Sequence, residues 1–194
     1  MINVGLLQEA WAFAQENPDQ YNPDSWGFRN AEGQAGETHD IAGIALKLLG
    51  ASFVWTPVAD YPPEIANQAV WGCQDVTFTS LPANVCKAIV EHCVKYSKDQ
   101  YADYFWHSVT TDRCPIGLAA RVALGITTAD ALVLFEEDAK PGEVENMVQK
   151  LLIRGAKQWK AAQDQLPEEQ MNPTEYLTAC LGARGVPVTV VEAS

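Results

Sequence analysis

Thr38-His-Asp-Ile-Ala-Gly-Ile-Ala-Leu-Lys-Leu-Leu-Gly50 is the stretch that decides the fold of this chain. Its apolar residues recur three and four positions apart, which is the spacing of one helical face, so the sequence predicts a helix from Thr38 to Leu49. Threonine is favoured at the N-cap position, and glycine is typical of the position after the last helical turn. The face expected to point inward consists of Ile41, Ile44, Ala45, Leu48 and Leu49.

Six further segments carry helix signals of this kind. The clearest start is Asn172-Pro-Thr-Glu175, which combines a capping asparagine, proline at the first helical position and glutamate at the third. Short β-branched and aromatic runs predict at most a small sheet, from residues 52–56, 75–79 and 186–191. We therefore expect one mainly α domain over residues 1–194 with about seven helices: residues 1–16, 38–49, 80–97, 115–125, 127–135, about two dozen residues after Pro141, and 172–185.

The chain contains a candidate internal duplication of residues 7–50 and 82–125. At an offset of 75 residues, the helix that ends at Gly50 aligns with the helix that ends at Gly125. An offset of 74 aligns almost as many residues, so the shared composition of two helices remains the alternative explanation.

Composition and charge restrict the class of partner. Of the 194 residues, 47% are hydrophobic, which is ample for a core, and the formal net charge is −12. Because an acidic surface repels phosphate groups, we expect no nucleic-acid partner and no binding to an anionic membrane. The charge permits a protein partner. We also expect no transmembrane segment, since no stretch approaches the roughly 18 uninterrupted apolar residues that one requires.

The longest predicted loop, from Asn17 to Glu37, is the candidate binding segment. Loops longer than about 12–15 residues in a compact domain are either functional or mobile. Three aromatic residues, Tyr21, Trp26 and Phe28, interrupt this polar segment, and we expect them to anchor it to the core. Trp26 is the candidate binding residue if it faces a partner instead.

The His39-Asp40 pair is the most suggestive catalytic pattern. In the HD superfamily of metal-dependent phosphohydrolases such a dyad binds a divalent cation. That family also uses an upstream histidine, but His39 is the first histidine here. Asp40 also has a structural explanation, because a carboxylate in the first helical turn complements the helix dipole. We expect no metal and no other cofactor.

A metal site would need further ligands, for which the candidates are His92, His107 and Asp112. Cys114 follows His107 by seven residues. The spacing does not show whether His39, Asp40, His107 and Cys114 converge in space, and we expect no catalytic residue among them.

Asp40-Ile-Ala-Gly-Ile-Ala45 follows the pair Trp26-Gly27, and Leu124-Gly-Ile-Thr127 precedes Leu134-Phe135. With these motifs, residues 7–50 and 119–135 resemble small uncharacterised proteins of actinobacteria and their phages. The pattern there is Cys-Ile-Ala-Gly-x-Ala, so Asp40 stands where that pattern has cysteine. The resemblance implies a helical cytoplasmic protein, phage-encoded in some genomes, with no established activity.

The function expected from these observations is non-catalytic. We expect a protein-binding accessory or regulatory factor that acts on a host system. The alternative is a metal-dependent, HD-like hydrolase that uses His39 and Asp40.

The cysteines provide a first test. Their number, five, is odd, and they lack the spacing of a disulfide framework, which indicates a reducing cytoplasm. Thiol titration of the denatured, unreduced protein should therefore find all five cysteines free. A count of three or one would contradict this prediction.

Overall fold

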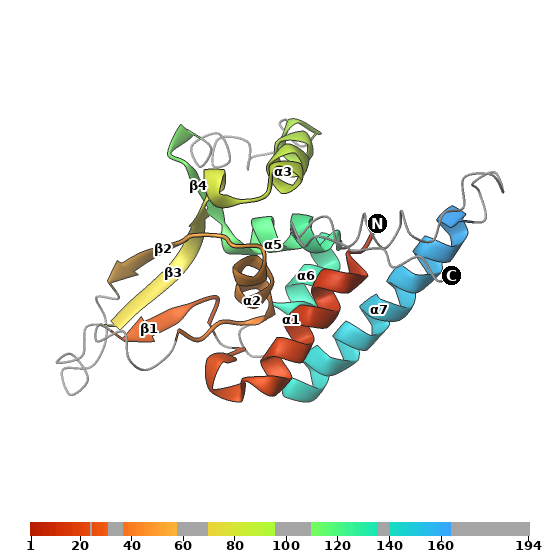
Figure 1. The fold of residues 1–194 in the computed structure, drawn as a ribbon, viewed down its shortest axis with the longest axis horizontal. Coiled ribbons are helices and arrows are strands. Elements are labelled where there is room, and N and C mark those ends of the chain that lie inside the picture. The colour runs from red at the N-terminus through yellow and green to blue at the C-terminus, as the bar shows by residue number, and fades with distance from the viewer. Residues whose placement is uncertain (24, 31–36, 58–69, 96–109, 136–139, 164–194) are drawn as a thin grey trace, which may run out of the picture.

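The computed structural model describes residues 1–23, 25–30, 37–57, 70–95, 110–135 and 140–163. These residues form a layer of helices with a small sheet at one end (Figure 1). Six α-helices are described: α1 (Val4–Glu16), α2 (Ile41–Leu48), α3 (Ala83–Lys95), α5 (Ile116–Leu124), α6 (Thr128–Leu134) and α7 (Pro141–Gln163). Two 3-10 turns lie at Pro18–Gln20 and Phe78–Ser80.

The mainly α fold with a small sheet is confirmed, although the described residues hold six helices where about seven were expected. The expected helix at 172–185 and the expected strand at 186–191 lie outside the described residues. The four strands are β1 (Phe28–Asn30), β2 (Phe53–Pro57), β3 (Val70–Thr77) and β4 (Arg113–Pro115). No single described helix is long and apolar enough to cross a membrane by itself.

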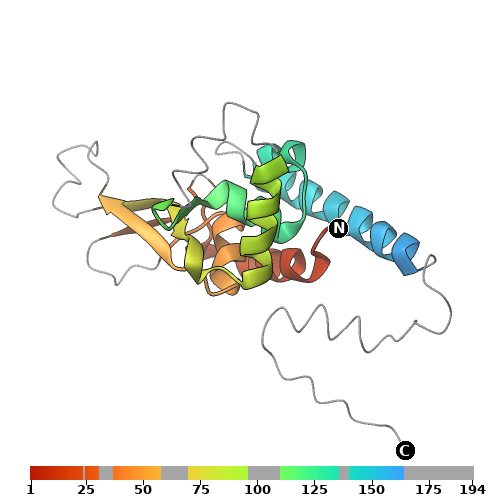
Figure 2. The same cartoon turned by 90° about the horizontal axis from the view of Figure 1, so that it is seen from above.

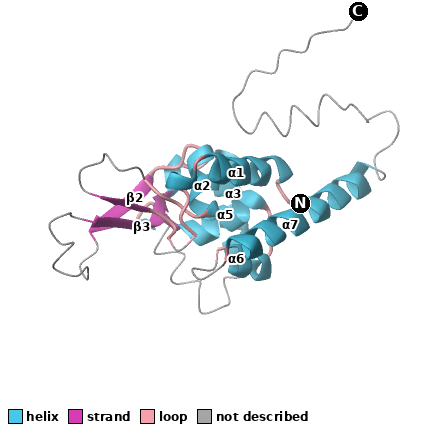
Figure 3. Cartoon of the chain, turned by 90° about the horizontal axis from the view of Figure 1, so that it is seen from below, coloured by secondary structure: helices cyan, strands magenta, loops and turns pink. Residues whose placement is uncertain are grey.

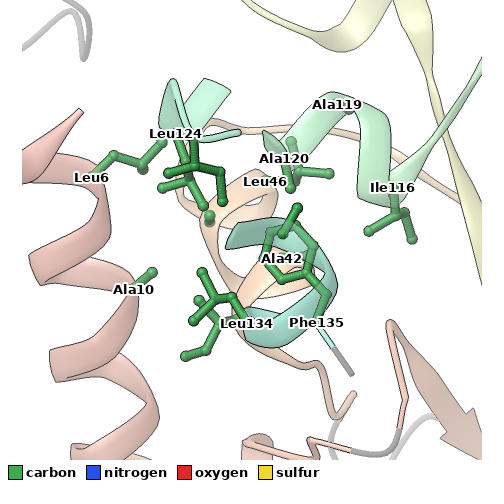
Figure 4. Packing of buried hydrophobic residues seen from close by; sticks show 14 of the residues in the cluster. Leu6, Ala10, Ala42, Leu46, Ile116, Ala119, Ala120, Leu124, Leu134 and Phe135 are labelled. Carbon is green, nitrogen blue, oxygen red and sulfur yellow. The ribbon is translucent and has the colours of Figure 1, made fainter. Parts of the chain in front are cut away.

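Helix α2 lies at the centre of the helical layer, packed against α1 on one side and α5 on the other. Residues 41–46 are all buried, so the helix is covered on every side over this stretch and not on one face alone. The expected inward position of Leu48 is wrong, because that side chain is 40% exposed at the end of the helix. Small side chains make the close approach of α2 and α5 possible: Figure 4 shows Ala42 facing Ala120, with Leu46 beside them.

The predicted start of α2 at Thr38 is also wrong. The helix begins at Ile41, and the N-cap is Asp40, whose side chain accepts a hydrogen bond from the Gly43 N–H. Residues 38–40 instead have extended backbone bonded to the preceding loop: the N–H of His39 donates to the carbonyl of Gln20, and Thr38 and Phe28 exchange two hydrogen bonds. These backbone bonds, which no side-chain pattern reveals, hold the described part of the 17–37 loop against α2.

Other helix boundaries follow the sequence signals more closely. Thr127 and Asp130 form a reciprocal capping box at the start of α6, and Gly125 ends α5 in the left-handed conformation with φ 64°. Helix α7 has 23 residues, as expected. Helix α3 begins at Ala83, not at Ser80, because the Ser80 hydroxyl donates to the Thr77 carbonyl within a 3-10 turn.

The sheet is antiparallel, with β3 at its centre. Strand β2 pairs with one side of β3, and β1 and β4 pair with the other side. In this register Arg29 lies opposite Trp71, and Trp55 lies opposite Cys73. Since directly opposed residues share a face and side chains alternate along a strand, these four side chains lie on the same face. The strands extend away from the helices at one end of the molecule (Figures 2 and 3).

The two segments of the candidate duplication have similar helix packing. Helix α1 packs on α2, α3 packs on α5, and α2 and α5 pack on each other. A common origin of 7–50 and 82–125 remains a prediction. The four cysteines within the described residues, Cys73, Cys86, Cys93 and Cys114, are free thiols. Cys180 lies outside them.

Trp26 anchors the loop to the helical layer. Its ring packs against α5, where a Cβ on Gly117 would lie 2.8 Å from the ring. Since Trp26 is only partly buried, Trp26→Ala should lower the free energy of unfolding by about 3 kcal/mol, the lower end of the range for loss of a large buried aromatic. Urea denaturation of the variant and the parent measures this difference in the free energy of unfolding. Trp71→Ala is the control. Among the described residues, Trp71 is not one of the side chains that pack against the core cluster, so this variant should lose less stability than Trp26→Ala. Equal denaturation midpoints for Trp26→Ala and the parent would contradict the anchoring role.

Candidate functional site

His39 is enclosed between two glycines at the start of α2, and its side chain is 1% exposed. A Cβ on Gly27 would overlap the Cys73 sulfur and lie 3.0 Å from His39 Nδ1. A Cβ on Gly43 would overlap the Trp26 carbonyl oxygen and lie 2.8 Å from the same nitrogen. Both positions therefore need glycine because the imidazole, the thiol and the carbonyl are closely packed around them.

The hydrogen bonding of His39 defines its tautomer. Nδ1 lies 3.0 Å from the Trp26 carbonyl oxygen. Because a carbonyl oxygen can only accept, Nδ1 carries the proton. Burial lowers the pKa of His39, although the bond to Trp26 and the nearby Glu37 carboxylate oppose this effect, so the ring is neutral near pH 7. Nε2 then presents a lone pair, and it lies 3.6 Å from Glu37 Oε2, beyond hydrogen-bond distance.

Asp40 serves the helix and not a shared site with His39. Its Oδ1 accepts a hydrogen bond of 2.7 Å from the Gly43 N–H. Burial raises the pKa of Asp40 to about 7, against the hydrogen bonds from Gly43 and Ala42. Within the described residues, Asp40 Oδ2 and His39 Nε2 are buried atoms without a hydrogen-bond partner. The two side chains thus make hydrogen bonds to different groups: Asp40 to the N–H of Gly43 in α2, and His39 to the carbonyl of Trp26.

The other candidate ligands have separate roles. His92 of α3 lies 2.6 Å from the Arg121 guanidinium, and the Asp112 carboxylate accepts from the Thr79 N–H and hydroxyl. Cys114 is buried in β4, where burial raises the pKa of its thiol to about 12. His107 lies outside the described residues. In the described part of the chain, no three His, Cys, Asp or Glu side chains are grouped so that they could hold a metal ion. The absence of a metal remains a prediction.

The structure assembles one group of residues that the sequence analysis missed: Arg29, Trp55 and Trp71, the aromatic–arginine cluster. The guanidinium carbon of Arg29 lies 4.4 Å from the centre of a Trp55 ring and 5.8 Å from that of a Trp71 ring. Such distances are those of cation–π contacts. The three residues come from three strands, and only the pairing register unites them. Alternation of apolar and polar residues within one strand provides no signal for this.

Charged side chains adjoin the cluster. Glu37 Oε1 lies 4.0 Å from Arg29 Nη1, and Glu37 Oε2 lies 3.6 Å from Lys47 Nζ. The side chains of Arg29, Glu37 and Lys47 are 35%, 36% and 37% exposed. Among the described residues, two cations and one anion lie here beside a neutral His39, so these side chains together carry a net positive charge on a protein whose formal net charge is −12. The cluster can therefore bind an anionic or aromatic group.

Comparison of the chain with protein-family models, curated proteins and solved structures finds no match. The function is therefore inferred from the geometry of the described residues.

Two aspartates allow a test of the site electrostatics with opposite signs. In the unfolded chain Asp40 has an ordinary pKa near 3.8, whereas its folded pKa is about 7. The folded state therefore holds the extra proton between these values, and stability falls as pH rises from about 4 to about 7, by about 4 kcal/mol in total. Asn at position 40 also caps a helix but cannot ionise. Asp40→Asn should match the parent in urea denaturation at pH 4 and exceed its stability at pH 8.

Asp130 provides the matched control. Burial opposes its ionisation, but hydrogen bonds from Arg154 and Thr127 outweigh burial and hold its pKa below the usual value. Its contribution to stability is thus present above the unfolded pKa and is lost as pH falls. Asp130→Asn should be less stable than the parent at pH 7, and the difference should shrink at acidic pH. If the stability difference between Asp40→Asn and the parent changes with pH in the same direction as that of Asp130→Asn, burial of the ionised Asp40 carboxyl does not destabilise the fold.

Proposed function

We propose that this protein is a non-catalytic, protein-binding accessory or regulatory factor, and that the aromatic–arginine cluster is its binding face. The observation that carries the proposal is the stacking of a partly exposed arginine over two tryptophans at the end of the sheet that extends from the helices. Arginine and tryptophan are the residue types most enriched among those that dominate binding energies at protein interfaces.

The packing of the two tryptophans favours binding over a purely structural role. Trp55 lies against the buried cluster and also contacts the aromatic ring of Phe53, so the core holds its ring in place. Trp71 is not among the described side chains that pack against the buried cluster, and the Arg29 guanidinium carbon lies 5.8 Å from the centre of a Trp71 ring. A rigid tryptophan, a stacked arginine and a tryptophan free of the core offer a partner a preorganised surface, which reduces the entropy lost on binding.

No observation in the described residues favours the metal-dependent hydrolase. Asp40 Oδ1 accepts the helix-capping hydrogen bond from Gly43, and His39 Nδ1 donates a hydrogen bond to the Trp26 carbonyl. The remaining His39 atom, Nε2, faces a carboxylate that already neighbours Lys47 and Arg29. Positive charge beside this position opposes a second cation.

The test begins with identification of a partner by cross-linking in lysate of an actinobacterium, the setting that the resemblance to actinobacterial and phage proteins implies. The recovered protein is then purified and titrated by calorimetry. Trp71→Ala should weaken binding by at least about tenfold, as expected for a hot-spot tryptophan. Arg113→Ala, an exposed arginine on β4, should bind like the parent. Equal affinities of Trp71→Ala and the parent would contradict the proposed face.

The hydrolase alternative has its own test in the same preparations. A cation bound only by the folded state would raise the melting temperature. We expect manganese, zinc and magnesium to leave it unchanged. A metal-dependent increase that His39→Ala abolishes would favour the hydrolase.

A further inference from the structure

The donor groups of Arg29 indicate the chemistry of the partner. The guanidinium carbon lies 4.4 Å from the centre of a Trp55 ring, and a guanidinium held by such a contact keeps its N–H donors for hydrogen bonds. Within the described residues, the Arg29 guanidinium donates no side-chain hydrogen bond, and the nearest carboxylate oxygen there, Glu37 Oε1, lies 4.0 Å from its Nη1 atom. An arginine held in this way is preorganised to bind a planar anionic group through two parallel hydrogen bonds.

Glu37 satisfies Arg29 only in part. Its carboxylate is shared between Arg29 at 4.0 Å and Lys47 at 3.6 Å. On the buried side it faces His39 Nε2 at 3.6 Å, which is beyond hydrogen-bond distance. Glu37 therefore receives no hydrogen bond from His39. The result is an incomplete ion pair that a better placed carboxylate can replace.

The position of Trp71 favours a ligand that also has an apolar group. It lies directly opposite Arg29 in the strand register and outside the core packing. A ligand that reaches the Arg29 edge therefore passes over an indole ring. A carboxylate next to an apolar side chain fits this arrangement better than a small inorganic anion, which gains nothing from the ring.

Resting on the proposed binding function, we infer that the aromatic–arginine cluster binds an acidic peptide segment of its partner, with one carboxylate on Arg29 and an adjacent apolar side chain on Trp71. Glu37 is the internal competitor for Arg29. The net charge of −12 opposes such a partner at long range, but salt at physiological concentration screens charges beyond about 8 Å and affects the direct contact much less.

The indole N–H signals of the folded protein provide the measurement. The chain has six tryptophans, and Trp55→Phe and Trp71→Phe assign two of the indole signals in an NMR spectrum. The probe is the peptide acetyl-Glu-Leu-Glu-Glu-Leu-amide, and its glutamine counterpart is the control. We expect the acidic peptide to shift the Trp55 and Trp71 signals selectively. The glutamine peptide should not shift them at the same concentration.

The variants move the affinity in opposite directions. Arg29→Lys keeps the charge but loses the planar pair of donors, so the acidic peptide should bind more weakly by about fivefold or more. Glu37→Gln removes the competitor, so the peptide should bind more tightly. Arg113→Ala should leave the affinity unchanged. Thermal melts confirm that each variant is folded.

The inference is overturned if the acidic peptide does not bind, if the glutamine peptide causes equal shifts or if a lysine counterpart binds more strongly. It is also overturned if inorganic phosphate matches the acidic peptide or if Glu37→Gln binds the peptide more weakly. A lysine preference would identify a basic partner, and matching phosphate would identify a general anion site. If the calorimetric partner needs Trp71 but the acidic peptide fails, the proposed function stands and this inference does not. If the peptide binds but the partner ignores Trp71, the converse holds.

Discussion

The hydrogen bond between His39 Nδ1 and the Trp26 carbonyl is the interaction on which the arrangement of this molecule depends. It forms in a space that two glycines leave open, and it joins the loop to the start of α2. Gly27 also binds the sheet, since its carbonyl accepts from the Cys73 N–H. One imidazole thus lies where the loop, the central helix and the central strand meet. This bond replaces the water that Nδ1 loses on burial, whereas Nε2 has no hydrogen-bond partner within the described residues.

This junction has consequences for both layers. On the helical side, Asp40 follows His39 directly and caps α2, so the position of the imidazole also sets the start of the most buried helix. On the sheet side, the ring packs against Phe53 and Trp55 of β2, with ring centres at 4.6 and 6.0 Å. The orientation of Trp55, and through it that of Arg29, therefore depends on a residue inside the core. His39 therefore contacts both the start of α2 and the proposed binding face.

The charge distribution has a similar logic. Burial favours the neutral form of both His39 and Asp40, and it raises the pKa of Asp40 to about 7, so this carboxyl is largely neutral only below pH 7. The ionised groups Arg29, Glu37 and Lys47 lie outside the core, each about one-third exposed. Acidic groups dominate the sequence as a whole, whereas these three described groups comprise two cations and one anion. His39 and Asp40, which resemble a catalytic pair in sequence, thus have structural roles: Asp40 caps α2, and His39 packs against Trp55 of the cluster.

Local signals in the sequence were sufficient for the mainly α class, the capping box of α6, the glycine that ends α5 and the length of α7. These features depend on interactions within one or two helical turns, so neighbouring residues determine them. The start of α2 and the burial of Leu46 needed the tertiary structure, because strand-like pairing of residues 38–40 and helices on two sides of α2 override the local pattern. The aromatic–arginine cluster could be found only from the tertiary structure. Arg29, Trp55 and Trp71 are up to 42 positions apart, since 71 − 29 = 42, and only the register of three strands brings them to one face. Hydrogen bonds between distant strands set that register, and no segment of the chain contains them by itself.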